Sequence, residues 1–386
     1  MASFAKKEVE VIIVGAGPAG LAVSACLNKL AIKNVVLEKE DCCGYLWKKK
    51  TYDRLHLHLS KEFCSLPLKP HANSAPKYLS KNEFIQYLDE YVENFNINPK
   101  FQHCVEMAFY EKEEKKWNIK VRNVASGEME IYASDFLVLA SGENSEGYIP
   151  KVLGIEKFKG EIIHSSEYKS GQKYEGKEVL VVGSGNSGME IAYDLSNYKS
   201  CTSIVVRSPI HVLTREMVHT GMLLLKYLPI SLVDTLIAKC AKFRFGNLAK
   251  LGIPQPEEGP FYIKISKGRS PVIDVGAIDK IKLGEIKVLS GISNIKENTV
   301  VFDNGEEHQV DAIIFATGYK NAATKWLKDY SSIFLDDGTL INEFPNHWKG
   351  ENGLYCAGFS KRGLFGISMD AKSIVENINI VRGEKI

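Results

Sequence analysis

Two glycine-rich stretches have the residue types and the spacing of a dinucleotide-binding turn. The first reads VIIVGAGPAGLA at 11–22, and the second reads VVGSGNSGME at 181–190. In the pattern G-x-G-x-x-G, the first glycine permits a tight turn, the second lets the backbone approach a pyrophosphate, and the third lets a helix pack on a strand. The N-terminus of the helix then faces the anion. Because each stretch follows an apolar strand pattern and opens a helical one, the sequence predicts two dinucleotide sites. Their candidate contacts are Gly15, Gly17 and Gly20 in the first turn, and Gly183, Ser184, Gly185, Asn186, Ser187 and Gly188 in the second.

The residue at the end of the next strand distinguishes the two ligands. Glu38 lies 23 residues after Gly15. An acid there accepts hydrogen bonds from a free adenosine ribose and would repel a 2′-phosphate, so the first turn suits FAD or NAD(H). Arg207 lies 24 residues after Gly183. If it is not a plain surface arginine, its guanidinium can pair with a 2′-phosphate. The two turns together predict FAD and NADPH, because a flavin accepts a hydride and then reacts with oxygen.

The elements that must position these turns occur in two long-range copies. A strand, the glycine turn, a helix and a second strand cover 8–40, and the same plan returns over 178–207. Each copy is followed by an acid, an apolar strand and a small-residue turn, DFLVLASG at 135–142 and DAIIFATG at 311–318, the latter adding Thr317 and Gly318 to the candidate cofactor contacts. The uninterrupted apolar strands are typical of parallel sheets covered on both faces.

We therefore predict an α/β fold with two Rossmann-like dinucleotide-binding domains, in which the NADPH domain is inserted into the FAD domain. The FAD domain is expected to comprise 1–150 and 312–386. The NADPH domain is expected to comprise 151–311, with a lid-like substrate region at about 209–260.

Composition narrows the class of protein. The chain has 386 residues, 45% of them hydrophobic and 25% charged, with a formal net charge of +2. These values fit a soluble enzyme and indicate no nucleic-acid partner. The stretch 221–243 is apolar but contains lysines, an aspartate and Pro229. It predicts no membrane span, and either a core or lid helix or a helix on a membrane surface.

The eight cysteines are scattered, without CxxC or metal-ligand spacing. This pattern predicts no metal site and reduced thiols in the cytoplasm. The adjacent Cys42 and Cys43 are either redox-active or ordinary loop thiols. A flavin-dependent disulfide reductase is disfavoured, because it needs a thiol pair that can exchange with the flavin.

The segment that joins the two copies reads FKGEIIHSSEYK at 158–169 and has the pattern F-x-G-x-x-x-H-x-x-x-Y. With this pattern and FATGY at 315–319, the chain resembles the flavin-containing monooxygenases. The stretches 51–67, 211–222 and 344–371 resemble the plant YUCCA group within that family, and NHWKGENGLYCAGF is similar to the subgroup of YUCCA ten and eleven.

The resemblance implies a reaction with a small-molecule substrate and O₂. NADPH reduces FAD, the reduced flavin captures oxygen as a C4a-peroxyflavin, and this attacks the keto carbon of indole-3-pyruvate. Carbon dioxide leaves and indole-3-acetate, the auxin, forms without a protein nucleophile or a metal. Two other functions stay open: an N- or S-oxygenase of the same fold, and a redox-sensing protein that binds both dinucleotides without turnover.

The resemblance also points to single residues. Trp47 is similar to a family tryptophan near the isoalloxazine ring and is otherwise a core residue. His58 stands where other members have an asparagine that bonds the oxygenated flavin, and it either contacts flavin or packs. Phe359 replaces an acid that many FAD proteins have near the ribityl chain. Lys361 and Arg362 pair either with a substrate carboxylate or with solvent.

Overall fold

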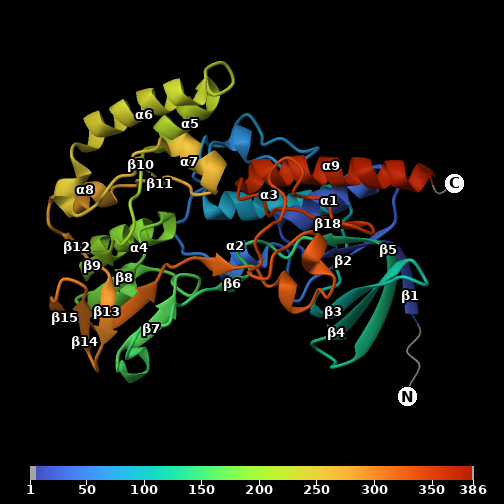
Figure 1. Ribbon diagram of the computed structural model, residues 1–386, viewed down its shortest axis with the longest axis horizontal. Coiled ribbons are helices and arrows are strands. Elements are labelled where there is room, and N and C mark those ends of the chain that lie inside the picture. Colours follow the sequence, from blue (N-terminus) through green and yellow to red (C-terminus); the bar gives the residue numbers. More distant parts are fainter. Residues whose placement is uncertain (1–5, 385–386) are drawn as a thin grey trace. The chain divides into compact units, whose positions relative to one another are not determined.

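The computed structural model describes residues 6–384 of the chain, which form two compact units (Figure 1). One unit comprises the residues up to Lys49, Lys61–Glu146 and the residues from Tyr319 onward, and the other comprises Lys50–Ser60 and Gly147–Gly318. The domain boundaries expected at 150 and 312 remain a prediction. The compact units divide the chain close to those positions and assign 50–60, a segment inside the first stretch, to the second unit.

The first unit is built on a sheet whose central strands are parallel. The β1 strand pairs in parallel with β2 on one side and with β5 on the other, while β18 pairs in parallel with the C-terminal end of β5. An antiparallel ribbon of β4 and β3 extends the sheet from the N-terminal part of β5. The strands are β1 (Lys6–Val14), β2 (Asn34–Leu37), β3 (His103–Glu111), β4 (Lys116–Asn123), β5 (Met129–Leu139) and β18 (Leu354–Cys356).

Four helices of the first unit pack in two pairs. The α1 helix (Pro18–Lys29) begins directly after the first glycine turn, and the C-terminal helix α9 (Gly363–Glu384) lies beside it (Figure 1). The α3 helix (Lys81–Asn94) begins at a capping box, in which Ser80 and Glu83 satisfy each other's backbone N–H groups. The short α2 helix (Tyr45–Lys49) packs against α3.

The second unit contains a sheet of five parallel strands, as the apolar patterns predict. Successive residues of its central strand are buried on opposite faces, with Val179 and Val181 in one hydrophobic cluster and Leu180 and Val182 in another. The order across the sheet is β12 (Ile286–Leu289), β9 (Cys201–Val205), β8 (Glu178–Val182), β16 (Ala312–Phe315) and β7 (Glu161–His164). The predicted α/β class with Rossmann-like sheets is thereby confirmed.

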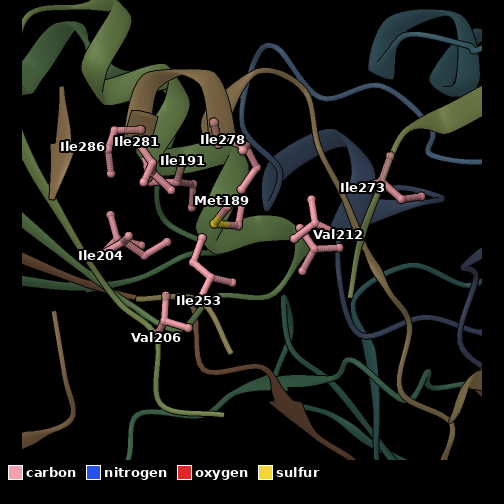
Figure 2. Packing of buried hydrophobic residues seen from close by; sticks show 14 of the residues in the cluster. Met189, Ile191, Ile204, Val206, Val212, Ile253, Ile273, Ile278, Ile281 and Ile286 are labelled. Carbon is pink, nitrogen blue, oxygen red and sulfur yellow. The ribbon is translucent and has the colours of Figure 1, made fainter. Parts of the chain in front are cut away.

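Different layers cover the two faces of this sheet. Figure 2 shows Met189 and Ile191 of α4 (Asn186–Asn197) in a cluster with Ile204 of β9 and Ile278 of α8 (Ala277–Lys282). The other face packs against the antiparallel strands β13 (Ile292–Ile295) and β14 (Thr299–Phe302). The strand β15 (Glu307–Gln309) pairs with β14.

The lid-like region expected at 209–260 is mainly helical. Its helices α5 (Arg215–Leu224) and α6 (Ile230–Phe245) pack on each other, and α7 (Pro260–Lys267) packs on α6. The buried carboxylate of Asp234 in α6 accepts hydrogen bonds from the N–H groups of Phe261 and Tyr262, which begin α7. None of the helices in residues 6–384 combines the length and the apolar content that a bilayer span requires.

The remaining elements are short. They are β6 (Glu146–Gly147), β10 (Val212–Leu213), β11 (Val272–Ile273), β17 (Tyr319–Lys320) and the 3₁₀ helices η1 (Lys61–Phe63), η2 (Ile155–Lys157), η3 (Gly171–Tyr174), η4 (Leu248–Leu251), η5 (Ala323–Lys325) and η6 (Tyr330–Ser332).

Candidate functional site

The two glycine turns have the same backbone geometry. The first glycines, Gly15 and Gly183, both have φ of +112°. A Cβ atom at either would lie 2.5 Å from a carbonyl oxygen, that of Ala140 in the first unit and that of Ala316 in the second. These alanines belong to the small-residue turns that repeat in the sequence. The predicted long-range repeat is therefore a repeat of contacts, in which each small-residue turn supports one glycine turn.

The second and third glycines of each turn face opposite surroundings. A Cβ on Gly20 or Gly188 would lie within 2 Å of the carbonyl oxygen of the first glycine, at 1.9 and 1.8 Å, so only glycine allows the helix to pack this closely. A Cβ on Gly17 or Gly185 would meet no atom within 4 Å. These two glycines cap the N-termini of α1 and α4 without a side-chain hydrogen bond. Each turn thus offers unused backbone N–H groups beside open space, which fits a pyrophosphate.

Glu38 lies beside the first turn and is buried. Its Oε2 atom accepts a hydrogen bond of 2.6 Å from the N–H of Ala16, and its Oε1 atom accepts one of 3.0 Å from the N–H of Glu40. Burial raises the pKa of Glu38, and the two backbone N–H groups oppose that shift. A carboxylate can accept about four hydrogen bonds. The side chain therefore fixes the turn and keeps acceptor capacity for a ribose hydroxyl.

Arg207 follows the strand β9, which pairs in parallel with β8 up to Val182 and Val205. It therefore lies at the same sheet edge as the second glycine turn. Its side chain is exposed, and within residues 6–384 it makes no hydrogen bond or ion pair. A guanidinium with all its donors free, next to a dinucleotide turn, is suited to a phosphate.

The polar side chains of the second turn divide into two kinds. The amide of Asn186 is engaged by β11 and its neighbour, accepting from the N–H of Ile273 at 2.7 Å and donating to the carbonyl oxygen of Pro271 at 3.3 Å. The hydroxyls of Ser184 and Ser187 have no hydrogen bond to any other described residue. The serines are thus free to bind an anion, whereas Asn186 holds the turn in place.

Thr317 and Gly318 lie in the turn that follows β16, where they bind Tyr148 and, through Gly318, the joining segment. The hydroxyl of Thr317 donates to the carbonyl oxygen of Tyr148. The carbonyl oxygen of Gly318 accepts from the N–H of Tyr148 at 2.9 Å and from Nε2 of His164 at 3.0 Å. His164 is the histidine of the joining pattern, so two separate sequence marks meet in one contact.

The other members of the joining pattern also have structural roles. The hydroxyl of Tyr168, which is 1% exposed, donates to Oδ2 of Asp194 at 2.6 Å. The same oxygen accepts the N–H of Gly171 at 2.8 Å. A Cβ on Gly160 would lie 2.4 Å from the carbonyl oxygen of Asp311. The pattern therefore fixes the edge strand β7 and the segment after it to the rest of the second unit.

His58 belongs to the segment 50–60 of the second unit. Its Nε2 atom lies 2.6 Å from Oε1 of Glu190, whose side chain is 2% exposed in α4. In the same segment the guanidinium of Arg54 stacks on the ring of Tyr193, also in α4, at 4.4 Å. Two side chains of this segment therefore bind the helix that follows the second glycine turn. Glu190 and Tyr193 cannot be identified as these partners from the sequence, because both stand in an ordinary helical pattern.

Trp47 and Phe359 lie in the first unit. Trp47 is half-buried in α2, and its ring meets the ring of Phe84 edge-on at 4.6 Å. Phe359 is buried against the ring of Phe334 at 5.4 Å. Both residues therefore have aromatic packing partners within the first unit.

Metal and thiol chemistry have little support in the described part of the chain. Residues 6–384 contain no group of three or more histidine, cysteine, aspartate or glutamate side chains that could hold a metal ion. All eight cysteines are free thiols. Burial raises the pKa of Cys43 to about 11, so this member of the adjacent pair is a poor thiolate at neutral pH.

A protein-family model and several named relatives match most of this chain. The family model described as flavin-binding monooxygenase-like matches residues 6–337. The chain is 51% identical over 375 residues to "Probable indole-3-pyruvate monooxygenase YUCCA10" of Arabidopsis thaliana, covering 97% of this chain and 98% of the relative. It is 47% identical to "Indole-3-pyruvate monooxygenase YUCCA6" of the same plant, covering 95% of this chain and 89% of the relative.

Solved structures share the fold at low sequence identity. A flavin-containing monooxygenase from Stenotrophomonas maltophilia matches with a TM-score of 0.73 at 18% identity, covering 97% of this chain and 99% of its own. The OTEMO complex with FAD and NADP matches with a TM-score of 0.76 at 16% identity, covering 98% of this chain and 85% of its own.

Proposed function

The chain belongs to the flavin-binding monooxygenase-like family, and we propose that it uses FAD and NADPH to convert indole-3-pyruvate and O₂ into indole-3-acetate and CO₂, a step that makes auxin. The substrate is proposed from the relatives, which are named indole-3-pyruvate monooxygenases and match the chain over almost its whole length. The cofactor pair is proposed from the chain's own residues.

The observation that carries the proposal is that two glycine turns of the same backbone geometry have residues of opposite charge beside them. The turns share their φ angles and their open second glycine. The first has a buried carboxylate beside it, and the second has an exposed, unpaired guanidinium at the same sheet edge. A carboxylate selects an unmodified ribose and a guanidinium selects a 2′-phosphate. This difference supports FAD at the first turn and NADPH at the second.

In the first unit, the backbone N–H groups around Gly17 would hold the FAD pyrophosphate and Glu38 would bind the ribose. In the second unit, Ser184, Ser187 and the backbone around Gly185 would hold the NADPH pyrophosphate, and Arg207 its 2′-phosphate. The bound flavin supplies hydride acceptance and oxygen activation, which no side chain can provide. The residues of this chain bind and orient the cofactors and keep water from the reacting atoms.

The location of the enzyme is also a proposal. We place it in the cytoplasm, since its eight cysteines carry no disulfide pattern and are free thiols.

Product analysis tests the proposed function. The purified holoenzyme is supplied with NADPH, O₂ and indole-3-pyruvate, and indole-3-acetate, CO₂ and consumed NADPH are measured together. We expect one indole-3-acetate and one CO₂ for each NADPH. An N- or S-oxygenated product without CO₂ from an amine or thioether, with no conversion of indole-3-pyruvate, would instead establish the alternative oxygenase.

A further inference from the structure

Arg362 lies at the ligand-binding edge of the first unit. The strands β1, β5 and β18 run parallel and end at Val14, Leu139 and Cys356 in register. Open parallel sheets bind their ligands beyond the carboxyl ends of the strands. Arg362 comes six residues after the end of β18, on the edge where the first glycine turn also lies.

Two contacts hold the segment that carries Arg362 close to that turn. A Cβ on Gly358 would lie 3.0 Å from the Cβ of Ala19, which is in the first turn of α1. The N–H of Lys361 donates to Oε2 of Glu143 at 3.1 Å, and Glu143 follows the small-residue turn that supports Gly15. The segment 358–362 is therefore anchored beside the glycine turn at both of its ends.

The guanidinium of Arg362 has no ion-pair partner within 4 Å among the described residues, and the charge of Asp370, whose oxygens are already engaged, acts on it only at longer range. Its side chain is partly buried and stacks on the ring of Phe344 at 3.7 Å. Within residues 6–384 it makes no hydrogen bond or ion pair. Burial lowers the pKa of Arg362, but an arginine stays charged at neutral pH. A partly desolvated cation whose donors are unused is costly in the folded protein, so an incoming anion would be favoured.

The aromatic platform under Arg362 is itself fixed. Phe344 stacks on His347 with ring centroids 5.7 Å apart. His347 lies 3.0 Å from Oδ1 of Asp370, and both side chains are 1% exposed. The other oxygen of Asp370 accepts the N–H of Gly358 at 2.9 Å. Both carboxylate oxygens are thus engaged, and the stacked guanidinium keeps its edge N–H groups available for a bidentate contact.

We propose that Arg362 binds the carboxylate of the 2-oxo acid substrate, with Phe344 holding the guanidinium plane in place. This inference rests on the proposed function, because it assumes a substrate that carries a carboxylate. A cofactor phosphate is the other anion that this edge could receive. The first glycine turn already offers backbone donors and the N-terminus of α1 to the FAD pyrophosphate, which leaves Arg362 for the substrate.

The test compares Arg362→Met and Arg362→Lys with Arg122→Met, which removes an exposed arginine that pairs with Glu106 elsewhere in the same unit. Binding of indole-3-propionate and of its uncharged amide is measured on each oxidised holoenzyme, where no turnover occurs. KM for indole-3-pyruvate and the FAD content are measured in parallel. The acid and the amide share the indole ring, so only their difference reports the carboxylate contact.

We expect Arg362→Met to weaken binding of the acid roughly 10- to 100-fold and to raise KM similarly, while binding of the amide and the FAD content stay unchanged. Arg362→Lys should lose less, because it keeps the charge without the bidentate geometry. Arg122→Met should match the wild type.

Three results would overturn the assignment. They are an unchanged affinity for the acid, an equal loss of affinity for the amide, and a loss of FAD from both Arg362 variants. The last would show that the guanidinium binds the cofactor instead of the substrate. If the wild type itself produces no indole-3-acetate, the proposed function fails. If it does and the Arg362 variants keep its KM, only the carboxylate site fails.

Discussion

The Nε2 atom of His164 lies 3.0 Å from the carbonyl oxygen of Gly318. Because a carbonyl oxygen only accepts, Nε2 must carry the proton. Nδ1 then accepts the N–H of Ser166 at 3.2 Å and lies 3.0 Å from the Ser166 hydroxyl. The contact with Gly318 joins the edge strand β7 to the turn that follows β16, next to the second glycine turn. The histidine of the joining pattern is thus neutral and buried, and it stabilises the second unit through this hydrogen bond.

The first prediction concerns the pH dependence of stability. Burial lowers the pKa of His164 below its ordinary value of 6.5. As the pH falls below 6.5, the unfolded chain binds a proton at this residue before the folded chain does, so the free energy of unfolding decreases. Urea unfolding at pH 7.5 and 5.5 should show a decrease in the free energy of unfolding that is smaller in His164→Gln than in the wild type, by up to about 1 kcal/mol. Equal decreases in the two proteins would show that His164 does not titrate in this way.

The second prediction concerns the buried pair of Tyr168 and Asp194. Tyr168→Phe removes a 2.6 Å hydrogen bond to a carboxylate that keeps its contact with the N–H of Gly171. We expect the free energy of unfolding to fall by about 1–2 kcal/mol, with no change in FAD content. Tyr227→Phe is the matched control, because that tyrosine is 84% exposed. The structural role of Tyr168 is refuted if both variants are as stable as the wild type.

The third prediction uses the open second glycines. A methyl group on Gly185 meets no atom within 4 Å of its Cβ, so Gly185→Ala should fold with a loss of less than about 1 kcal/mol. The methyl group would occupy the space beside the N-terminus of α4, and KM for NADPH should rise roughly tenfold or more. Gly17→Ala should instead reduce FAD content, which is measured from the flavin absorbance of the purified protein.

Gly183→Ala is the contrasting variant, since its methyl group would lie 2.5 Å from the carbonyl oxygen of Ala316. It should lower stability as well as NADPH binding. Unaltered kinetics with NADPH in Gly185→Ala would mean that the pyrophosphate does not approach this turn.

The parts of the fold that could be predicted from the sequence depend on local chemistry. A glycine with positive φ, a helix that starts three residues later and an uninterrupted apolar strand are all properties of short stretches. For this reason the turn geometry at Gly15 and Gly183 and the repeated strands follow from the sequence, while the cofactor contacts of these glycines stay a prediction. The match between 135–142 and 311–318 also foretold which segments support the two turns, because each copy conserves the same close contact.

Other features depend on contacts that no short stretch encodes. The segment 50–60 belongs to the second unit through pairs such as His58 with Glu190, which lie 132 residues apart. The joining pattern suggested a family, but only the structure shows that Tyr168 is held by Asp194. The sequence leaves two interpretations of Arg362, whereas its stack on Phe344 and its lack of an ion pair in the structure favour an anion-binding role.

The central claim is that the first glycine turn binds FAD and the second binds NADPH. Its most direct test is the coenzyme preference of Arg207→Glu. Flavin reduction is followed without oxygen, with NADPH and with NADH. The control is Lys287→Glu, which makes the same charge change at an exposed position of the adjacent strand β12, opposite Ser203 of β9. We predict that kcat/KM for NADPH relative to NADH falls at least roughly tenfold in Arg207→Glu only, with FAD content unchanged. A preference for NADPH as strong as that of the wild type would contradict the claim.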